Sequence, residues 1–110
     1  MKIVDLLKRE SVELNGKVTS KPETIEKMVA LMAAGGNLAD VEAYKKGVFA
    51  REEESTTGIG EGIAIPHAKS AAVKAPGLAA MVVKDGVDYD SLDGKPAKLI
   101  FLIAAPDTED

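Results

Sequence analysis

The chain of 110 residues contains no cysteine, which excludes disulfides, thiolate catalysis and zinc sites with cysteine ligands. It also lacks a basic patch, because the net charge is −4 and no run of basic residues is longer than a pair such as Lys45–Lys46. A nucleic-acid-binding surface normally shows clustered Lys and Arg, so no nucleic-acid partner is expected. The length is sufficient for one domain with one core, which we place at residues 1–110.

Long apolar runs are missing as well. No stretch reaches the roughly 18 apolar residues that suggest a membrane span, and the longest apolar run, LIFLIAAP, has the length of a strand. The N-terminal stretch MKIVDLLKRES has a short apolar patch that charges soon interrupt, unlike a secretory signal. The sequence therefore predicts no direct insertion into a membrane, and the lack of cysteine is compatible with a reducing cytosol.

Two segments have the apolar spacing of helices. In residues 19–36, Ser20 followed by Glu23 fits a capping box, and a glycine pair ends the helical pattern. Residues 38–53 carry apolar side chains on one face and predict a second helix. A short helix is also expected at residues 70–75, before a Pro-Gly pair.

The strand signals alternate with these helices and indicate an α/β fold. Residues 10–16 and 78–86 predict strands, and residues 97–106 form an almost wholly apolar strand. Such a strand is typically buried on both faces, in a sheet covered by helices on both sides. Two good helices are too few for that cover, so we infer that a C-terminal piece is missing or that another chain supplies it.

His67 is the only histidine in the chain. An imidazole titrates at about pH 6.5, so His67 is the side chain best suited to act as nucleophile, base or metal ligand near neutral pH. A lone histidine is more often a loop side chain without a role, but its context here favours one. Ile65 precedes proline and is restricted to extended geometry. Pro66 then holds His67 rigidly at a strand end, where sites of α/β sheets lie.

Two further features can support chemistry at His67. The alternate glycines Gly58, Gly60 and Gly62 can bring backbone N–H groups to a phosphate, although such glycines more often mark a bulge or a tight strand crossing. Arg51, at the end of the second predicted helix, is either a solvated helix-end charge or a fork that holds phosphate oxygens. The run at residues 52–54 is interpreted as a solvated acidic face.

Other chemistries find little support. One histidine with scattered carboxylates is not a zinc constellation, so no metal is expected. The glycine pattern is neither a Walker loop nor a dinucleotide fingerprint. Ser70 and Asp85 are present, but no nucleophile elbow accompanies them, which argues against a Ser-His-Asp hydrolase.

Residues 49–70, FAREEESTTGIGEGIAIPHAKS, resemble the signature of the fructose/mannitol-type EIIA domains (EIIA type 2) of the bacterial phosphoenolpyruvate-dependent sugar phosphotransferase system. In this signature an Arg-Glu pair is followed by Thr-Gly, by Gly-x-Gly and an apolar stretch, and then by Pro-His. The resemblance extends over nearly the whole chain, including IVDLL near the start and LIFLIAAP near the end. The matching positions are Arg51, Glu52, Thr57, Gly58, Gly60, Gly62, Ile63, Ile65, Pro66 and His67.

The resemblance implies a mixed β-sheet flanked by helices on both faces, with the C-terminal helices of the domain missing from residues 1–110. It implies a cytoplasmic phosphotransferase component in which His67 takes a phosphoryl group from the phosphocarrier protein HPr as a tele-phosphohistidine. His67 then passes the group to a cysteine of EIIB, for fructose/mannitol-type sugar uptake in which the EIIC permease takes part indirectly. Neither a metal nor an organic cofactor is implied.

The resemblance also assigns Arg51 to hold the phosphohistidine. The phosphoryl group brings a charge of roughly −1.5 to −2 and needs hydrogen-bond donors. The Arg51 guanidinium, the Thr57 hydroxyl and the glycine-loop N–H groups of Gly58, Gly60 and Gly62 are donors of the right type, if the fold brings them together.

The sequence departs from the family in two respects. Family domains are longer and carry a second histidine after the region matching AAPDTED, whereas this chain has none. Glu61 stands where a neutral polar residue is common. Two alternatives stay open: a nitrogen-type regulatory EIIA that signals through phosphorylation-dependent partner binding, and a binding module in which His67 is silent.

Overall fold

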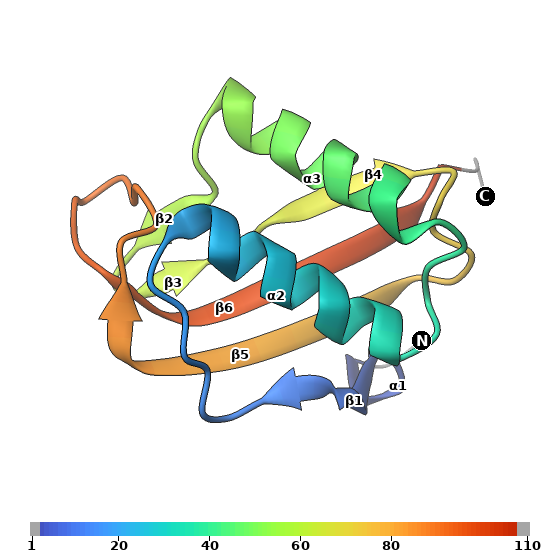
Figure 1. The fold of residues 1–110 in the computed structure, drawn as a ribbon, viewed down its shortest axis with the longest axis horizontal. Helices are drawn as coiled ribbons and strands as arrows, with labels where there is room; N and C mark the ends of the chain where they lie inside the picture. The colour runs from blue at the N-terminus through green and yellow to red at the C-terminus, as the bar shows by residue number, and fades with distance from the viewer. Residues whose placement is uncertain (1–2, 108–110) are drawn as a thin grey trace.

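A computed structural model describes residues 3–107 as two long helices lying against a mixed sheet (Figure 1). The elements are α1 (Ile3–Leu6), β1 (Leu7–Glu13), α2 (Lys21–Ala34), α3 (Val41–Glu54), β2 (Gly58–Gly60), β3 (Ile63–Ala64), β4 (His67–Ser70), β5 (Gly77–Val87) and β6 (Ala97–Pro106). No helix among residues 3–107 is both long enough and apolar enough to cross a membrane.

The sheet is six-stranded and follows the order β1-β5-β6-β3-β2, with β4 also pairing with β6. β5 and β6 run antiparallel, whereas β1 runs parallel to β5, and β3 and β4 run parallel to β6. The sheet is therefore mixed, and the predicted α/β class is confirmed. β6 matches the predicted strand at residues 97–106 and occupies the centre of the sheet, while β5 extends one residue beyond the prediction at each end.

α2 begins at its predicted cap, Ser20, whereas α3 begins at Val41, three residues after the predicted start at residue 38. The Ser20 hydroxyl accepts the Glu23 N–H at 3.2 Å, and the Glu23 carboxylate accepts the Thr19 N–H at 2.6 Å. In a capping box the glutamate normally bonds the cap residue itself, so here it reaches one residue farther back. α3 is capped by Asp40, whose carboxylate accepts the Ala43 N–H at 3.1 Å. These caps satisfy N–H groups that lack partners within the helix.

Two local predictions are wrong. Residues 70–75 are not helical, because β4 occupies His67–Ser70 and the chain then turns. β4 pairs in parallel with β6 and packs against α3, so pairing and tertiary contacts outweigh the local helix signal. The first strand covers Leu7–Glu13 rather than residues 10–16, and Leu14 lies outside it, 62% exposed.

Both α2 and α3 lie on one face of the sheet (Figure 1), where the sequence predicts helices on both faces. Side chains from α2 and α3 pack with alternate residues of β5 and β6 into one core. The remaining residues of β6 point to the opposite face, as strand geometry requires. Neither long helix covers them, and the expected burial of β6 on both faces is not seen: Leu99 and Phe101 are partly buried and Ile103 is 39% exposed.

Candidate functional site

His67 lies where one line of strand pairing is interrupted. β3 and β4 both run parallel to β6, with Ala64 opposite Ile100 and His67 opposite Ile103. Ile65 and Pro66 separate the two short strands, and the step from Ala64 to His67 matches that from Ile100 to Ile103, so the segment is extended as the sequence predicts. The Pro66 carbonyl accepts the Ile103 N–H at 3.1 Å, so the interruption is itself fixed to β6. His67 is therefore anchored by backbone pairing while its side chain stays exposed.

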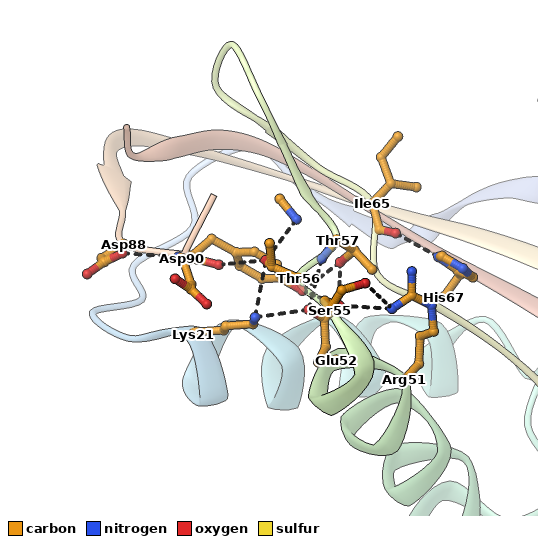
Figure 2. A network of polar contacts seen from close by, with 12 residues as sticks. Lys21, Arg51, Glu52, Ser55, Thr56, Thr57, Ile65, His67, Asp88 and Asp90 are labelled. Carbon is orange, nitrogen blue, oxygen red and sulfur yellow. Dashed lines mark hydrogen bonds and ion pairs between the residues drawn. The ribbon is translucent and has the colours of Figure 1, made fainter. Parts of the chain in front are cut away.

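The orientation of the His67 ring is set by one backbone group. Nδ1 lies 2.9 Å from the Ile65 carbonyl oxygen (Figure 2). Because a carbonyl only accepts, this hydrogen bond requires the proton on Nδ1. In the neutral ring Nε2 then carries a free lone pair. The exposed ring is thus oriented with its tele nitrogen available as a nucleophile.

A surface cavity of about 340 Å³ lies beside the ring. Its wall combines one cation with threonine and isoleucine side chains, and its lining residues are Arg51, Thr56, Thr57, Ile59, Ile65, His67 and Ile103. Arg51, in the last turn of α3, donates from Nη1 to the Ser55 carbonyl at 2.8 Å. Figure 2 shows its guanidinium on the same side of the α3 terminus as His67. The structure therefore brings the two main predicted site residues together.

The interpretation of residues 52–54 as a solvated face is wrong for Glu52, which is only 9% exposed. The Glu52 carboxylate accepts the Thr57 N–H at 3.1 Å, the Thr57 hydroxyl, and the Tyr89 hydroxyl at 3.1 Å. It also forms an ion pair with Lys21 at 3.0 Å. The only sequence signal for this role is the place of Glu52 in the family pattern, since an acidic run at a helix end normally lies in solvent.

Burial and hydrogen bonding act on Glu52 in opposite directions. Burial disfavours the charged carboxylate, but the Thr57 and Lys21 contacts outweigh it, so the pKa of Glu52 lies below its ordinary value. Burial raises the pKa of the neighbouring Tyr89 phenol, and the nearby Glu52 charge adds to that rise. Glu52 is therefore an anion and Tyr89 a neutral donor at neutral pH.

The other predicted donors lie in different surroundings. Thr57 lines the cavity but is only 4% exposed, and both its N–H and its hydroxyl are directed to Glu52. Gly58 begins β2, and its N–H donates to the Thr56 hydroxyl at 3.1 Å. Gly60 and Gly62 do not line the cavity. Their role as phosphate donors stays a prediction.

Gly60 instead ends β2, and Gly62 lies in the turn between β2 and β3. Both have positive φ, +100° and +80°, and Glu61 between them has φ +56°. The Asp93 carboxylate accepts the Glu61 N–H at 2.9 Å and the Lys95 N–H at 3.0 Å, and these bonds hold the pKa of Asp93 below its ordinary value. The glycines thus serve a left-handed turn, which side chains disfavour.

Comparison with known proteins gives a consistent picture. The chain is 51% identical over 105 residues to the PTS system fructose-specific EIIABC component of Bacillus subtilis, covering 96% of this chain and 16% of that protein. It is 40% identical over 97 residues to the PTS system fructose-specific EIIA component of Haloferax volcanii, covering 88% of this chain and 63% of that protein. The chain thus spans less than two thirds of the length of either relative.

Solved structures share the fold. The nitrogen regulatory protein IIA-Ntr of Neisseria meningitidis superposes with a TM-score of 0.85 at 33% identity, covering 94% of this chain and 70% of that one. A complex of enzyme IIAMTL with phosphorylated enzyme IIBMTL from Escherichia coli gives a TM-score of 0.81 at 28% identity, covering 94% of this chain and 74% of that one.

The family described as "Phosphoenolpyruvate-dependent sugar phosphotransferase system, EIIA 2" matches residues 5–110, which is nearly the whole chain. The mixed sheet is the one that the sequence resemblance implies, and Arg51 and His67 line one cavity. The chain therefore belongs to the EIIA type 2 family of the phosphoenolpyruvate-dependent sugar phosphotransferase system.

Proposed function

We propose that this chain is a phosphocarrier that accepts a phosphoryl group from HPr on His67 and passes it to a cysteine of EIIB. The observation that carries the proposal is the exposed His67 ring, whose Nδ1 is engaged by the Ile65 carbonyl beside Arg51. This geometry favours Nε2 as the acceptor, giving a tele-phosphohistidine. The proposal extends to fructose-type sugar uptake, because a fructose-specific relative is 51% identical.

Each step exchanges one bond to phosphorus for another. The Nε2 lone pair attacks the phosphorus of phosphorylated HPr, an N–P bond forms, and the bond to the HPr nitrogen breaks and returns its electron pair there. In the second step an EIIB thiolate forms an S–P bond, and the electron pair of the N–P bond returns to Nε2. Such transfers depend mainly on positioning and charge stabilisation, so few residues suffice.

Arg51 is the cation of the cavity and would meet the charge that arrives. A phosphohistidine carries roughly two negative charges near neutral pH, and a guanidinium can bond two of its oxygens at once. Arg51 retains donors for this role, because both hydrogen bonds from its guanidinium to Ser55 come from Nη1. We assign it to hold the phosphoryl group beside Nε2.

Partner docking is proposed at the same surface. Ile59 is 54% exposed and Ile103 39% exposed, and both line the cavity beside His67. The mannitol relative forms a complex with phosphorylated enzyme IIB, which supports an EIIB domain as the acceptor. We place this exchange in the cytoplasm, where EIIC would take part only through EIIB.

Phosphorylation with phosphoenolpyruvate, enzyme I and HPr tests the proposal. We expect one phosphoryl group per wild-type chain, stable in base and labile in acid, with the ³¹P signal of a tele-phosphohistidine. His67→Ala should take none, whereas the matched control Lys84→Ala, at an exposed site on β5 outside the cavity, should be labelled like wild type. Equal labelling of wild type and His67→Ala would rule the proposal out.

The regulatory alternative is supported by the similarity to IIA-Ntr, with a TM-score of 0.85. Both functions begin with phosphorylation of His67, so labelling does not separate them. Transfer does: a sugar carrier passes its phosphoryl group to the cysteine of a fructose-type EIIB within seconds to minutes, whereas a regulator keeps it. Retention of the label in the presence of reduced EIIB would favour the regulatory function.

A further inference from the structure

Glu52 is the most heavily bonded carboxylate among the described residues. It sits in the last turn of α3, its side chain is 5% exposed, and its partners come from three other parts of the chain. Thr57 follows α3, Lys21 begins α2, and Tyr89 lies between β5 and β6. A buried carboxylate with this many donors fixes the segments that supply them, because releasing any one leaves charge unsatisfied.

The segment fixed most directly is the bend at residues 55–57, between α3 and β2. On one side, Glu52 holds the Thr57 N–H and hydroxyl. On the other side, the Arg51 guanidinium holds the Ser55 carbonyl at 2.8 Å. Figure 2 shows the bend between these two adjacent side chains, with His67 beyond Arg51. The bend and the guanidinium are therefore positioned together.

Lys21 completes the arrangement from α2. Its ammonium lies 3.0 Å from Glu52 Oε1, 3.3 Å from the Thr56 hydroxyl and 4.9 Å from the centre of the Tyr89 ring. The ion pair compensates the charge of the buried carboxylate. Without it, an uncompensated anion would lie next to the arginine that is meant to hold an incoming phosphoryl group.

We propose that Glu52 is a positioning residue for phosphoryl transfer at His67, holding the bend at residues 55–57 so that Arg51 meets the phosphoryl group. The inference rests on the proposed phosphocarrier function. Glu52 does not line the cavity and does not reach the phosphoryl group itself; it acts through Thr57 and through the bend. The N–H and hydroxyl of Thr57 accordingly donate to Glu52 and are not available to a phosphate.

The substitution Glu52→Gln tests this inference, with Glu54→Gln as the control. Glu54 lies two residues farther along the same helix and is exposed, so its variant changes the same charge without the buried contacts. In Glu52→Gln an NH₂ group replaces one carboxylate oxygen, so a hydrogen-bond donor faces donors from Thr57, Tyr89 or Lys21 and some of those bonds are lost. We expect the first-order rate of transfer from phosphorylated HPr to fall about 10- to 100-fold, with KM for phosphorylated HPr within about twofold of wild type. Glu54→Gln should match wild type in both.

A purely stabilising role predicts a different result. It would lower the melting temperature of Glu52→Gln but leave the rate per folded molecule at the Glu54→Gln value, and that result would overturn the proposal. Should Glu52→Gln not fold, Tyr89→Phe removes a single donor to Glu52 with almost no change in volume, and we expect about a threefold lower rate. An unchanged rate in folded Tyr89→Phe would then overturn it.

A second readout does not require phosphorylation. The Arg51 Nε–H and His67 imidazole NMR signals of the unphosphorylated protein should shift in Glu52→Gln and stay in place in Glu54→Gln. Unlabelled wild type would reject the phosphocarrier function, and with it any role of Glu52 in transfer. Labelled wild type with unmoved Arg51 and His67 signals in Glu52→Gln would reject the positioning role alone.

Discussion

Replacing Lys21 should show how much stability is lost when the buried Glu52 carboxylate has no ion-pair partner. In Lys21→Met the ion pair at 3.0 Å is lost, while Glu52 keeps its bonds from Thr57 and Tyr89. Breaking one side of a buried pair typically costs 3–5 kcal/mol, because the remaining charge stays desolvated. The Lys21 side chain is 19% exposed and Glu52 retains other donors, so we expect the lower end of this range, about 3 kcal/mol.

The stability lost in Lys21→Met should depend on pH, and the pKa of Glu52 sets the direction of that dependence. The folded-state pKa of Glu52 is lowered, so its stabilising contribution is present above the ordinary carboxyl pKa and is lost as the pH falls through the folded value. Without Lys21, burial is opposed by fewer favourable contacts and the pKa rises. As the pH falls, Glu52 is protonated at a higher pH in the variant than in wild type, and protonation removes the unpaired buried charge. The stability difference should therefore be largest near pH 7 and shrink toward pH 4.

Urea unfolding at pH 7 and at pH 4 measures both quantities. Lys27→Met, at an exposed position on α2, controls for loss of a lysine from the same helix and should change stability by less than about 0.5 kcal/mol. A loss for Lys21→Met as small as that of the control, or one that is equal at the two pH values, would refute the reasoning.

Alanine substitutions at two glycines should change the free energy of unfolding in opposite directions. Gly47→Ala should raise the free energy of unfolding by up to about 1 kcal/mol, because Gly47 lies within α3 and a Cβ there would meet only the Ala68 Cβ, at 3.6 Å. Gly58→Ala should lower it by about 1–3 kcal/mol, because a Cβ would lie 2.6 Å from the Ser91 hydroxyl and 2.9 Å from its Cα. Thermal melting of both variants beside wild type checks the pair; a stabilised Gly58→Ala or a destabilised Gly47→Ala would contradict the packing described here.

Much of the fold could be predicted from local patterns. The cap at Ser20, the apolar spacing of both helices and the uninterrupted apolar run of β6 each follow from one stretch of sequence. β4 could not be predicted this way, because its four residues form a strand only through pairing with β6. The placement of both long helices on one face likewise depends on contacts distant in sequence.

In the site, too, residues with a local sequence signal could be predicted, whereas those fixed by contacts distant in sequence could not. His67 and Arg51 stood out by residue type, and the structure places both at one cavity. Glu52 did not, because its burial depends on Lys21 and Tyr89, which no local pattern connects to it. The alternate glycines suggest a phosphate loop from spacing alone, whereas Gly60 in fact ends β2 beside a turn in which Asp93 accepts the Glu61 N–H.

The central place of β6 has a consequence for how the protein is made. β6 is the last strand of the described chain, yet β3, β4 and β5 all pair with it. Before residues 97–106 leave the ribosome, α2 and α3 have no complete sheet to pack on, and β4 has no strand beside it. Such nascent chains expose apolar helix faces and unpaired edges, which chaperones and proteases recognise. His67 is therefore synthesised before β6, the strand on which its geometry depends.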